Sequence, residues 1–209
     1  MEVWTFITQK GGAGKSTLAT NMAVHAGEEG EKVLLLDVDF QSTSTKWWER
    51  RDEEYPDLKK IRPEEFDEAL NLAKRQGYSL VLVDTAGVHA LELHNTVVKA
   101  DFCIIPSQPS IADIEAVFPT VELMKRAAKN FSFVLTRCPA VGQDQVAARE
   151  GLSGLGLVAK PFTVERKAYK NSLAQGLGVT EYDPQDKATM EIKELFKWVK
   201  NKSRRLAAA

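Results

Sequence analysis

A stretch of glycines and lysines near the N-terminus limits the folds open to this chain more than any other feature. Residues 9–17 read Gln-Lys-Gly-Gly-Ala-Gly-Lys-Ser-Thr and directly follow the apolar, β-rich run Val3–Ile7. A helical pattern of apolar residues then begins at Leu18 and continues to Ala26. A glycine loop that joins a strand to a helix in this order is the arrangement of a phosphate-binding loop.

Each residue type in the loop has a physical role in holding phosphate. Glycines let backbone N–H groups turn inward around phosphate oxygens, where a Cβ would obstruct the approach. We expect Lys15 to reach the β- and γ-phosphates and the Ser16 hydroxyl to ligate Mg²⁺, at the positive end of the following helix. The predicted nucleotide-binding residues of the loop are Lys10, Gly11, Gly12, Ala13, Gly14, Lys15, Ser16 and Thr17.

A second lysine, Lys10, precedes Lys15 by five residues. The sequence Lys-Gly-Gly-Ala-Gly-Lys-Ser resembles the deviant Walker A loop of the ParA/MinD family of ATPases. The resemblance implies that Lys10 crosses a dimer interface and contacts the phosphates of the nucleotide held by the partner subunit. Lys10 and Lys15 are therefore both predicted catalytic residues.

Length and charge limit the possible classes of protein. A chain of 209 residues is long enough for one well-buried domain, and no shift in composition marks a second one. We expect a single domain over residues 1–205 and interpret residues 206–209 as a tail left by cloning. The net charge of −1 means that any affinity for nucleic acid must come from a local basic patch.

The compartment is predicted from the cysteines and from the hydropathy pattern. Cys103 and Cys138 lie in or beside apolar, strand-like runs, as buried reduced thiols of a cytosolic protein do. We find no signal peptide pattern and no apolar stretch of the roughly 20 residues that span a bilayer. We therefore expect a cytoplasmic protein without integral membrane association.

Strand-like and helical patterns alternate along the whole chain. We expect strands at residues 3–7, 32–37, 58–61, 80–84, 102–106, 131–136 and 157–160. Helices are expected after residue 17 and at about 46–54, 63–77, 91–99, 111–130, 143–154, 165–175 and 184–205. This alternation predicts an α/β fold, namely a three-layer α/β/α P-loop NTPase domain with a mostly parallel sheet. Ligands of such a sheet bind at the carboxyl ends of its strands.

Two aspartates follow the second predicted strand. Asp37 and Asp39 stand where the chain leaves the strand, so both side chains can reach the Mg²⁺ and γ-phosphate region. With Gln41 they resemble the Asp-x-Asp-x-Gln motif of the ParA/MinD family. The resemblance implies that Asp39 orients the attacking water and that Asp37 lies near the metal's water shell. Phe40 departs from the proline usual in ParA-type sequences, which puts the shape of this switch in question.

A third acid ends the predicted strand at residues 80–84. Asp84 closes an apolar run beside the phosphate loop, as a Walker B acid does, and is predicted to hold Mg²⁺ directly or through water. Gly87 can bring its backbone N–H close to the γ-phosphate. We interpret residues 85–94 as a nucleotide-sensing switch.

Further matches to the family surround these motifs. Residues 104–113 resemble the family segment that lines the dimer face. Arg137, Pro161 and Phe162 fall where the family surrounds adenine, and Arg137 can stack on the base through its guanidinium plane. The resemblance covers nearly the whole chain, and its most specific parts are residues 9–17, 37–41 and 84–87.

The C-terminal region offers two readings of what the domain binds. One is a patch for the phosphate backbone of DNA, with the candidate residues Arg166, Lys167, Lys170, Lys200, Lys202, Arg204 and Arg205. The other is a membrane-surface helix of the MinD type, because Ile192, Leu195, Phe196 and Val199 form an apolar stripe. We expect this stripe to pack against the domain instead.

Two other classes share the fold. Nitrogenase-reductase-like proteins hold an iron–sulfur cluster with two cysteines per subunit near the switch after the Walker B acid, but Cys103 and Cys138 lie in or at the end of other strands. Small-molecule ligases such as dethiobiotin synthetase are disfavoured by Lys10 and Gln41.

The resemblance therefore implies a ParA-like ATPase with ATP and Mg²⁺ as cofactors. Such a protein forms an ATP-dependent sandwich homodimer, binds DNA non-specifically on the nucleoid and segregates a plasmid or chromosome. A ParB-like or other adaptor protein then stimulates its otherwise slow hydrolysis. A MinD-like ATPase that regulates cell division and a ParA-type ATPase that positions a protein organelle are the alternatives.

Overall fold

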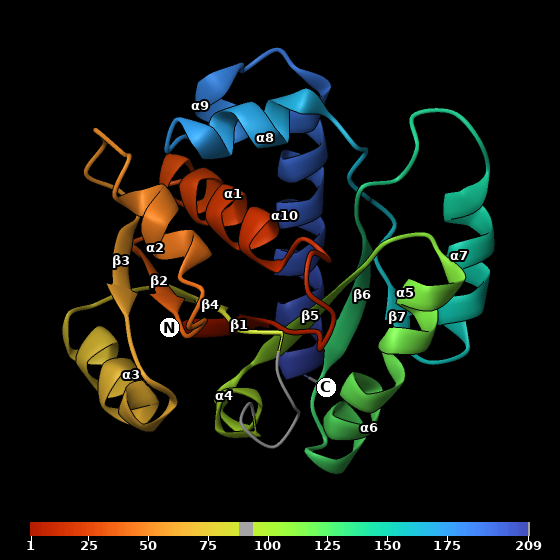
Figure 1. Ribbon diagram of the computed structural model, residues 1–209. Helices are drawn as coiled ribbons and strands as arrows, with labels where there is room; N and C mark the ends of the chain where they lie inside the picture. The colour runs from red at the N-terminus through yellow and green to blue at the C-terminus, as the bar shows by residue number, and fades with distance from the viewer. Residues whose placement is uncertain (88–93, 209) are drawn as a thin grey trace.

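The computed structural model describes residues 1–87 and 94–208, which form a seven-stranded sheet between two layers of helices (Figure 1). Every strand pairing in the sheet is parallel, and the strand order is β3-β2-β4-β1-β5-β6-β7. The strands are β1 (Glu2–Phe6), β2 (Val33–Asp37), β3 (Asp57–Lys60), β4 (Leu80–Asp84), β5 (Phe102–Ser107), β6 (Phe131–Leu135) and β7 (Leu157–Val158). The predicted three-layer α/β/α fold is confirmed.

The helices follow the strands in the alternation that the sequence predicts. They are α1 (Lys15–Glu28), α2 (Thr43–Trp48), α3 (Phe66–Arg75), α4 (His94–Lys99), α5 (Ile111–Ala116), α6 (Phe118–Arg126), α7 (Asp144–Ser153), α8 (Lys167–Ala174), α9 (Val179–Tyr182) and α10 (Lys187–Ala207), with a 3₁₀ turn at Pro63–Glu65 before α3. Helices α1 and α10 cover one face of the sheet, and α3, α4, α6 and α7 cover the other.

Alternation along the strands supplies the two faces of the sheet with apolar side chains. Leu80 and Leu82 of β4 belong to the core under α1 and α10, whereas Val81 and Val83 belong to the core under α3. Successive side chains of a strand point to opposite faces, so a strand with helices on both sides must be apolar throughout. All five residues of β4 are buried.

The predicted helix over residues 111–130 is wrong in one respect, because the structure divides it into α5 and α6. Pro119 lies in the first turn of α6. Proline has no N–H to donate and clashes with the preceding turn, so it begins a helix more readily than it continues one. The break leaves α5 as a short separate helix directly after β5.

Smaller differences occur at other boundaries. Helix α2 begins at Thr43, three residues before the predicted start, and the four-residue helix α9 was not predicted. Helix α10 continues to Ala207 and so includes the first two residues of the predicted tail.

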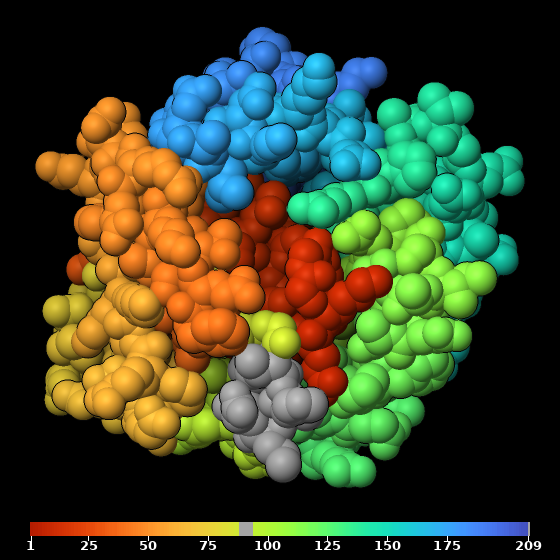
Figure 2. Space-filling view, in the orientation of Figure 1, coloured from red at the N-terminus to blue at the C-terminus, as the bar shows by residue number. Residues whose placement is uncertain are grey.

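The strand order brings the three sequence motifs together. Strands β2 and β1 both pair with β4, so Asp37 is in register with Asp84, and Phe6 is in register with the same residue. The loop after β1 therefore meets both acidic strand ends. Figure 2 shows this N-terminal segment (red) at the floor of a hollow, between orange residues of the α2 region and green residues of the α5 region.

Candidate functional site

The phosphate loop has the backbone conformation that its glycines allow. Gly12 and Gly14 have φ angles of 77° and 100°, a region that residues with a Cβ rarely adopt. Helix α1 begins at the next residue, Lys15, so its first N–H groups face the loop. Behind the loop, the Thr136 hydroxyl donates to the Ala13 carbonyl oxygen at 2.7 Å.

The side chain of Lys15 is turned into the protein. It is 7 % exposed, and its Nζ donates to the carbonyl oxygens of Thr8, at 3.2 Å, and Lys10, at 3.4 Å. Burial lowers the pKa of Lys15, while the negative charges of Asp84 and Asp39 act in the opposite direction. The loop and the two acids thus surround one inward-facing ammonium group.

Asp84 is completely buried at the end of β4. The Ser44 hydroxyl donates to its Oδ2 at 2.7 Å, whereas its Oδ1 has no hydrogen-bond partner among the described residues. Burial raises the pKa of Asp84 to about 7, and the nearby Ser16 and Ser44 hydroxyls oppose this shift. A buried carboxylate oxygen without a donor is a position that a cation or its bound water would satisfy.

The residues around Asp84 fit a nucleotide-bound Mg²⁺. Magnesium is held in proteins by one or two carboxylates or hydroxyls together with substrate phosphates and water. Asp84 and Ser16 supply such oxygens beside the phosphate loop. The described part of the chain contains no cluster of three or more His, Cys, Asp or Glu residues that could hold a metal without a phosphate.

Replacement of Asp84 by asparagine should change the pH dependence of stability. The pKa of Asp84 is about 7 when folded against 3.8 for an ordinary aspartate, so between these values the unfolded chain is ionised and the folded chain protonated. The wild type therefore loses about 1.4 kcal/mol of unfolding free energy per pH unit as the pH rises through this window. Without nucleotide, Asp84→Asn should be more stable than the wild type in urea at pH 8 and nearly equal at pH 4. An equal difference at both values would contradict this account.

Asp37 supports the loop that follows β2. Its Oδ2 accepts hydrogen bonds from the Thr45 N–H at 2.8 Å and the Thr45 hydroxyl at 2.6 Å, and its Oδ1 accepts one from the Asp39 N–H at 3.0 Å. All three donors belong to the loop and the start of α2. These bonds explain why α2 begins earlier than predicted. The predicted role of Asp37 near the metal stays a prediction.

Asp39 lies in the loop between Asp37 and α2 and is 8 % exposed. Its Oδ1 accepts a hydrogen bond from the Gln41 N–H at 2.8 Å, and its charge reaches Lys15. The neighbouring Phe40 is 72 % exposed, so the residue that departs from the family pattern points away from the core. The loop therefore fixes the carboxylate of Asp39 beside the phosphate loop and presents an aromatic ring at the surface.

Gly87 brings the chain after β4 against the phosphate loop. A Cβ at this position would lie 3.1 Å from the Gln9 carbonyl oxygen and 3.3 Å from the Gly11 nitrogen. The rest of the predicted switch at residues 88–93 lies outside the described residues.

Gly87→Ala should therefore weaken nucleotide binding without unfolding the domain. The added methyl group meets backbone atoms, which cannot rotate away as a side chain can, so the phosphate loop must shift. We expect the Kd for ATP in isothermal titration to rise about tenfold and the melting temperature to stay within a few degrees. Gly154→Ala is the matched control, because no atom lies within 4 Å of a Cβ built at that position. Unchanged affinity in Gly87→Ala would refute the close approach.

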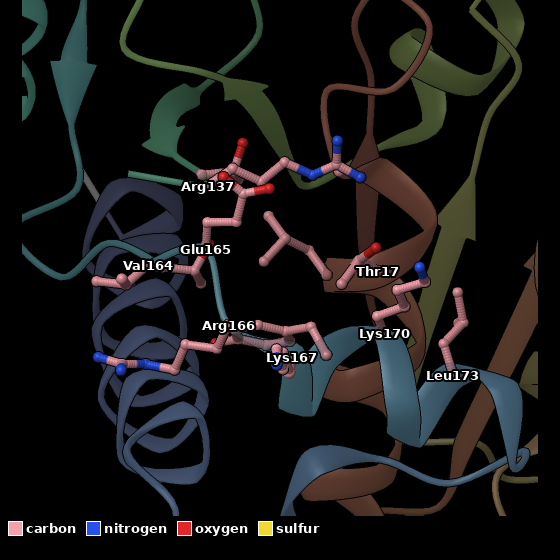
Figure 3. A pocket seen from close by; sticks show the side chains of 13 residues that line it. Thr17, Arg137, Val164, Glu165, Arg166, Lys167, Lys170 and Leu173 are labelled. Carbon is pink, nitrogen blue, oxygen red and sulfur yellow. The ribbon is translucent and has the colours of Figure 1, made fainter. Parts of the chain in front are cut away.

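A pocket of about 360 Å³ adjoins the phosphate loop (Figure 3). Arg137 lines it, as predicted for an adenine contact, but Pro161 and Phe162 do not. The lining comes instead from the residues that follow these two, and sequence reasoning did not assign them to the site. They include Thr163, Val164, Glu165, Tyr169 and Leu173, together with Gly14, Thr17 and Leu18 of the loop and α1.

A model of the CobQ/CobB/MinD/ParA nucleotide binding domain matches residues 4–203. The chain belongs to this family. "Maintenance of carboxysome distribution protein A" of Gloeobacter kilaueensis is 29 % identical over 180 residues, which cover 83 % of this chain and 81 % of the relative. "Protein virC1" of Rhizobium radiobacter is 28 % identical over 198 residues, which cover 85 % and 82 %.

Solved structures of the MinD/ParA type share the fold. Apo McdA from Cyanthece superposes with a TM-score of 0.77 at 17 % identity over 96 % of this chain and 98 % of that one. The cell division ATPase MinD of Pyrococcus furiosus gives a TM-score of 0.76 at 18 % identity over the same shares of the two chains. The MinD/ParA resemblance predicted from the loop is thereby confirmed.

Several of the candidate DNA-binding residues are engaged within this MinD/ParA domain. Arg166 pairs with Glu191 at 2.7 Å, Lys200 with Glu31 at 2.6 Å and Arg204 with Glu2 at 3.0 Å. Figure 3 shows Arg166 directed away from the pocket, toward α10. Lys167, Lys170 and Arg205 are exposed, and Lys202 lies over the Trp198 ring.

The apolar stripe of α10 and the two cysteines are buried, as predicted. Ile192, Leu195, Phe196 and Val199 of the stripe are at most 3 % exposed and belong to the core over β1 and β4. Burial raises the pKa of both cysteine thiols to about 12, so neither is poised to ligate a metal as a thiolate. In residues 1–87 and 94–208, no helix is long and apolar enough to cross a bilayer.

Proposed function

We propose that this chain is a ParA-like ATPase that hydrolyses ATP to ADP and phosphate and joins two subunits in an ATP sandwich dimer. The observation that carries the proposal is the opposite direction of the two loop lysines. Lys15 is buried toward Asp84 and Asp39, whereas the side chain of Lys10 is 34 % exposed on the outside of the same loop. An inward lysine serves the subunit's own nucleotide, and an outward lysine is available to a second subunit.

Hydrolysis at this site rests on positioning and charge rather than on a covalent intermediate. The loop N–H groups and Lys15 hold the phosphates of ATP, and Asp39 orients the attacking water. Asp84 and Ser16 hold Mg²⁺, which neutralises charge on the phosphates when bound. With a single carboxylate to orient the water, we expect turnover to be slow until a partner protein completes the site.

The biological role that we propose is to position or segregate cargo. Relatives of the chain are named for carboxysome distribution and, at 29 % identity over 164 residues, for plasmid partitioning in Thermus thermophilus. Plasmid, chromosome and protein organelle are therefore the candidate cargoes. A ParB-like or other adaptor protein would link the dimer to its cargo and stimulate hydrolysis.

Non-specific DNA binding would place the dimer on the nucleoid. Lys167 and Lys170 are exposed at the start of α8 beside the nucleotide pocket, and Lys202 and Arg205 add positive charge at the end of α10. Dimerisation doubles each group of charges, and affinity for the DNA backbone rises steeply with the number of phosphates contacted. A membrane-surface role is not favoured, because the apolar stripe of α10 lies in the core.

Charge reversal on α8 tests the DNA-binding part of the proposal. Lys167→Glu with Lys170→Glu should reduce ATP-dependent affinity for a duplex of arbitrary sequence at least about tenfold at low salt, and should flatten the dependence on salt by about one logarithmic unit per lost phosphate contact. Fluorescence anisotropy with ATP and with ADP measures both. Lys74→Glu with Arg75→Glu makes the same charge change at the end of α3, on the other face of the sheet, and should have little effect. Equal losses in the two variants, or no ATP-dependent binding by the wild type, would refute DNA binding through α8.

A further inference from the structure

The outward lysine of the phosphate loop has an anionic partner within its own subunit. Lys10 Nζ lies 2.7 Å from Asp113 Oδ2, and the side chain of Asp113 is only 6 % exposed. Asp113 belongs to α5, the short helix that the break at Pro119 separates from α6. The ion pair therefore joins the phosphate loop after β1 to the first helix after β5.

The carboxylate of Asp113 is fixed before Lys10 reaches it. The Ser110 hydroxyl donates to Asp113 Oδ2 and accepts a hydrogen bond from the Asp113 N–H at 3.1 Å. The other oxygen, Oδ1, is buried without a hydrogen-bond partner among the described residues. A carboxylate held in this way keeps a strong demand for a positive partner, since burial disfavours an unpaired charge.

A second contact joins the same segment to the loop. The Gln108 side-chain amide donates to the Gly12 carbonyl oxygen at 3.2 Å. Gln108 and Asp113 lie at the two ends of the turn from β5 into α5, and both contact the loop on the side where Lys10 stands. The β5–α5 turn thus fixes the loop and its outward lysine together.

We propose that Asp113 is a positioning residue that holds Lys10 against its own subunit until the phosphates of a partner's nucleotide replace it. This inference rests on the sandwich dimer proposed above. Dimerisation then requires an exchange of anions at Lys10, from a buried carboxylate to the nucleotide of the second subunit. The γ-phosphate gives ATP more negative charge than ADP, so an anionic competitor at Lys10 makes the exchange favourable for ATP and unfavourable for ADP. Asp113 would therefore set the nucleotide threshold for dimerisation.

Asp113→Asn is the variant that tests this exchange. Asparagine retains the shape of the side chain and an oxygen that accepts from Ser110, but it removes the charge that competes for Lys10. We expect the ATP concentration for half-maximal dimerisation in sedimentation velocity to fall at least fivefold, and ADP to support partial dimerisation. Glu115→Gln is the matched control, since it removes one charge from an exposed position of the same helix.

Chemical labelling provides a readout that does not depend on the dimer. In nucleotide-free protein, acetic anhydride should modify the Lys10 amine at least threefold faster in Asp113→Asn than in Glu115→Gln, as followed by peptide mass spectrometry. Equal labelling would overturn the ion pair in solution. Faster labelling with an unchanged ATP midpoint would overturn the exchange but leave the proposed function intact. A wild type that stays monomeric with ATP would instead overturn the proposed function, and the exchange with it.

Discussion

Asp39→Ala is expected to bind ATP with nearly wild-type affinity and to hydrolyse it at least about 100-fold more slowly. A residue that orients or deprotonates the attacking nucleophile contributes roughly 10² to 10⁴ to the rate. The carboxylate of Asp39 is 8 % exposed and fixed by the Gln41 N–H, so water has little freedom to take over its position. Phosphate release measured with saturating ATP and Mg²⁺ reports the rate, and titration with a non-hydrolysable analogue reports the affinity.

The control for this loss lies nearby in the sequence. Asp52→Ala removes an exposed carboxylate beyond the end of α2 and should leave both rate and affinity unchanged. Asp39→Asn keeps the hydrogen bond from Gln41 and should be almost as slow as Asp39→Ala. Turnover at the parent rate in Asp39→Ala would show that the water-orienting assignment is wrong.

Lys10→Ala is expected to abolish dimerisation on ATP while leaving ATP binding in place. The outward position of Lys10 gives it no contact with the nucleotide side of its own loop, where Lys15 lies. Loss of one partner of a buried charge pair across an interface costs about 2–5 kcal/mol, which weakens the dimer by roughly 30-fold to more than 1,000-fold. Light scattering at micromolar protein should then detect only the monomer.

The second lysine of the loop is the matched comparison. Lys15→Ala removes the inward ammonium group and should lose ATP affinity itself, so it fails to dimerise for a different reason. Titration with ATP separates the two variants, because Lys10→Ala should bind with nearly wild-type affinity. A Lys10→Ala variant that dimerises normally would refute the role given to this lysine.

Local patterns were enough to predict the fold and the main motifs. Asp37 and Asp84 each end an apolar run, and parallel strands bring such ends to one edge of the sheet, so their convergence follows from sequence alone. The partners of these acids could not be found in the same way. The hydroxyl on Asp84 comes from Ser44, 40 residues away, and nothing in the polar loop distinguishes Ser44 from its neighbours Ser42 and Thr43.

Charges were harder to interpret than strands. The basic residues of the C-terminal region form a patch when counted along the sequence, but Lys200 and Arg204 pair with acids at the far end of the chain, on Glu31 and Glu2. The pair between Lys10 and Asp113 was equally hidden, because it joins turns that follow two neighbouring strands, β1 and β5. A sequence shows which side chains are charged, whereas their partners depend on the strand order.

The central claim is that ATP joins two copies of this chain through Lys10, and sedimentation velocity of the slow-turnover variant tests it most directly. Asp39→Ala with ATP and Mg²⁺ should sediment with the mass of two chains, and the same protein with ADP should sediment as one. Adding Lys10→Ala to this variant should return it to a single chain in the presence of ATP. A dimer that forms equally with ADP, or that survives the loss of Lys10, would contradict the account.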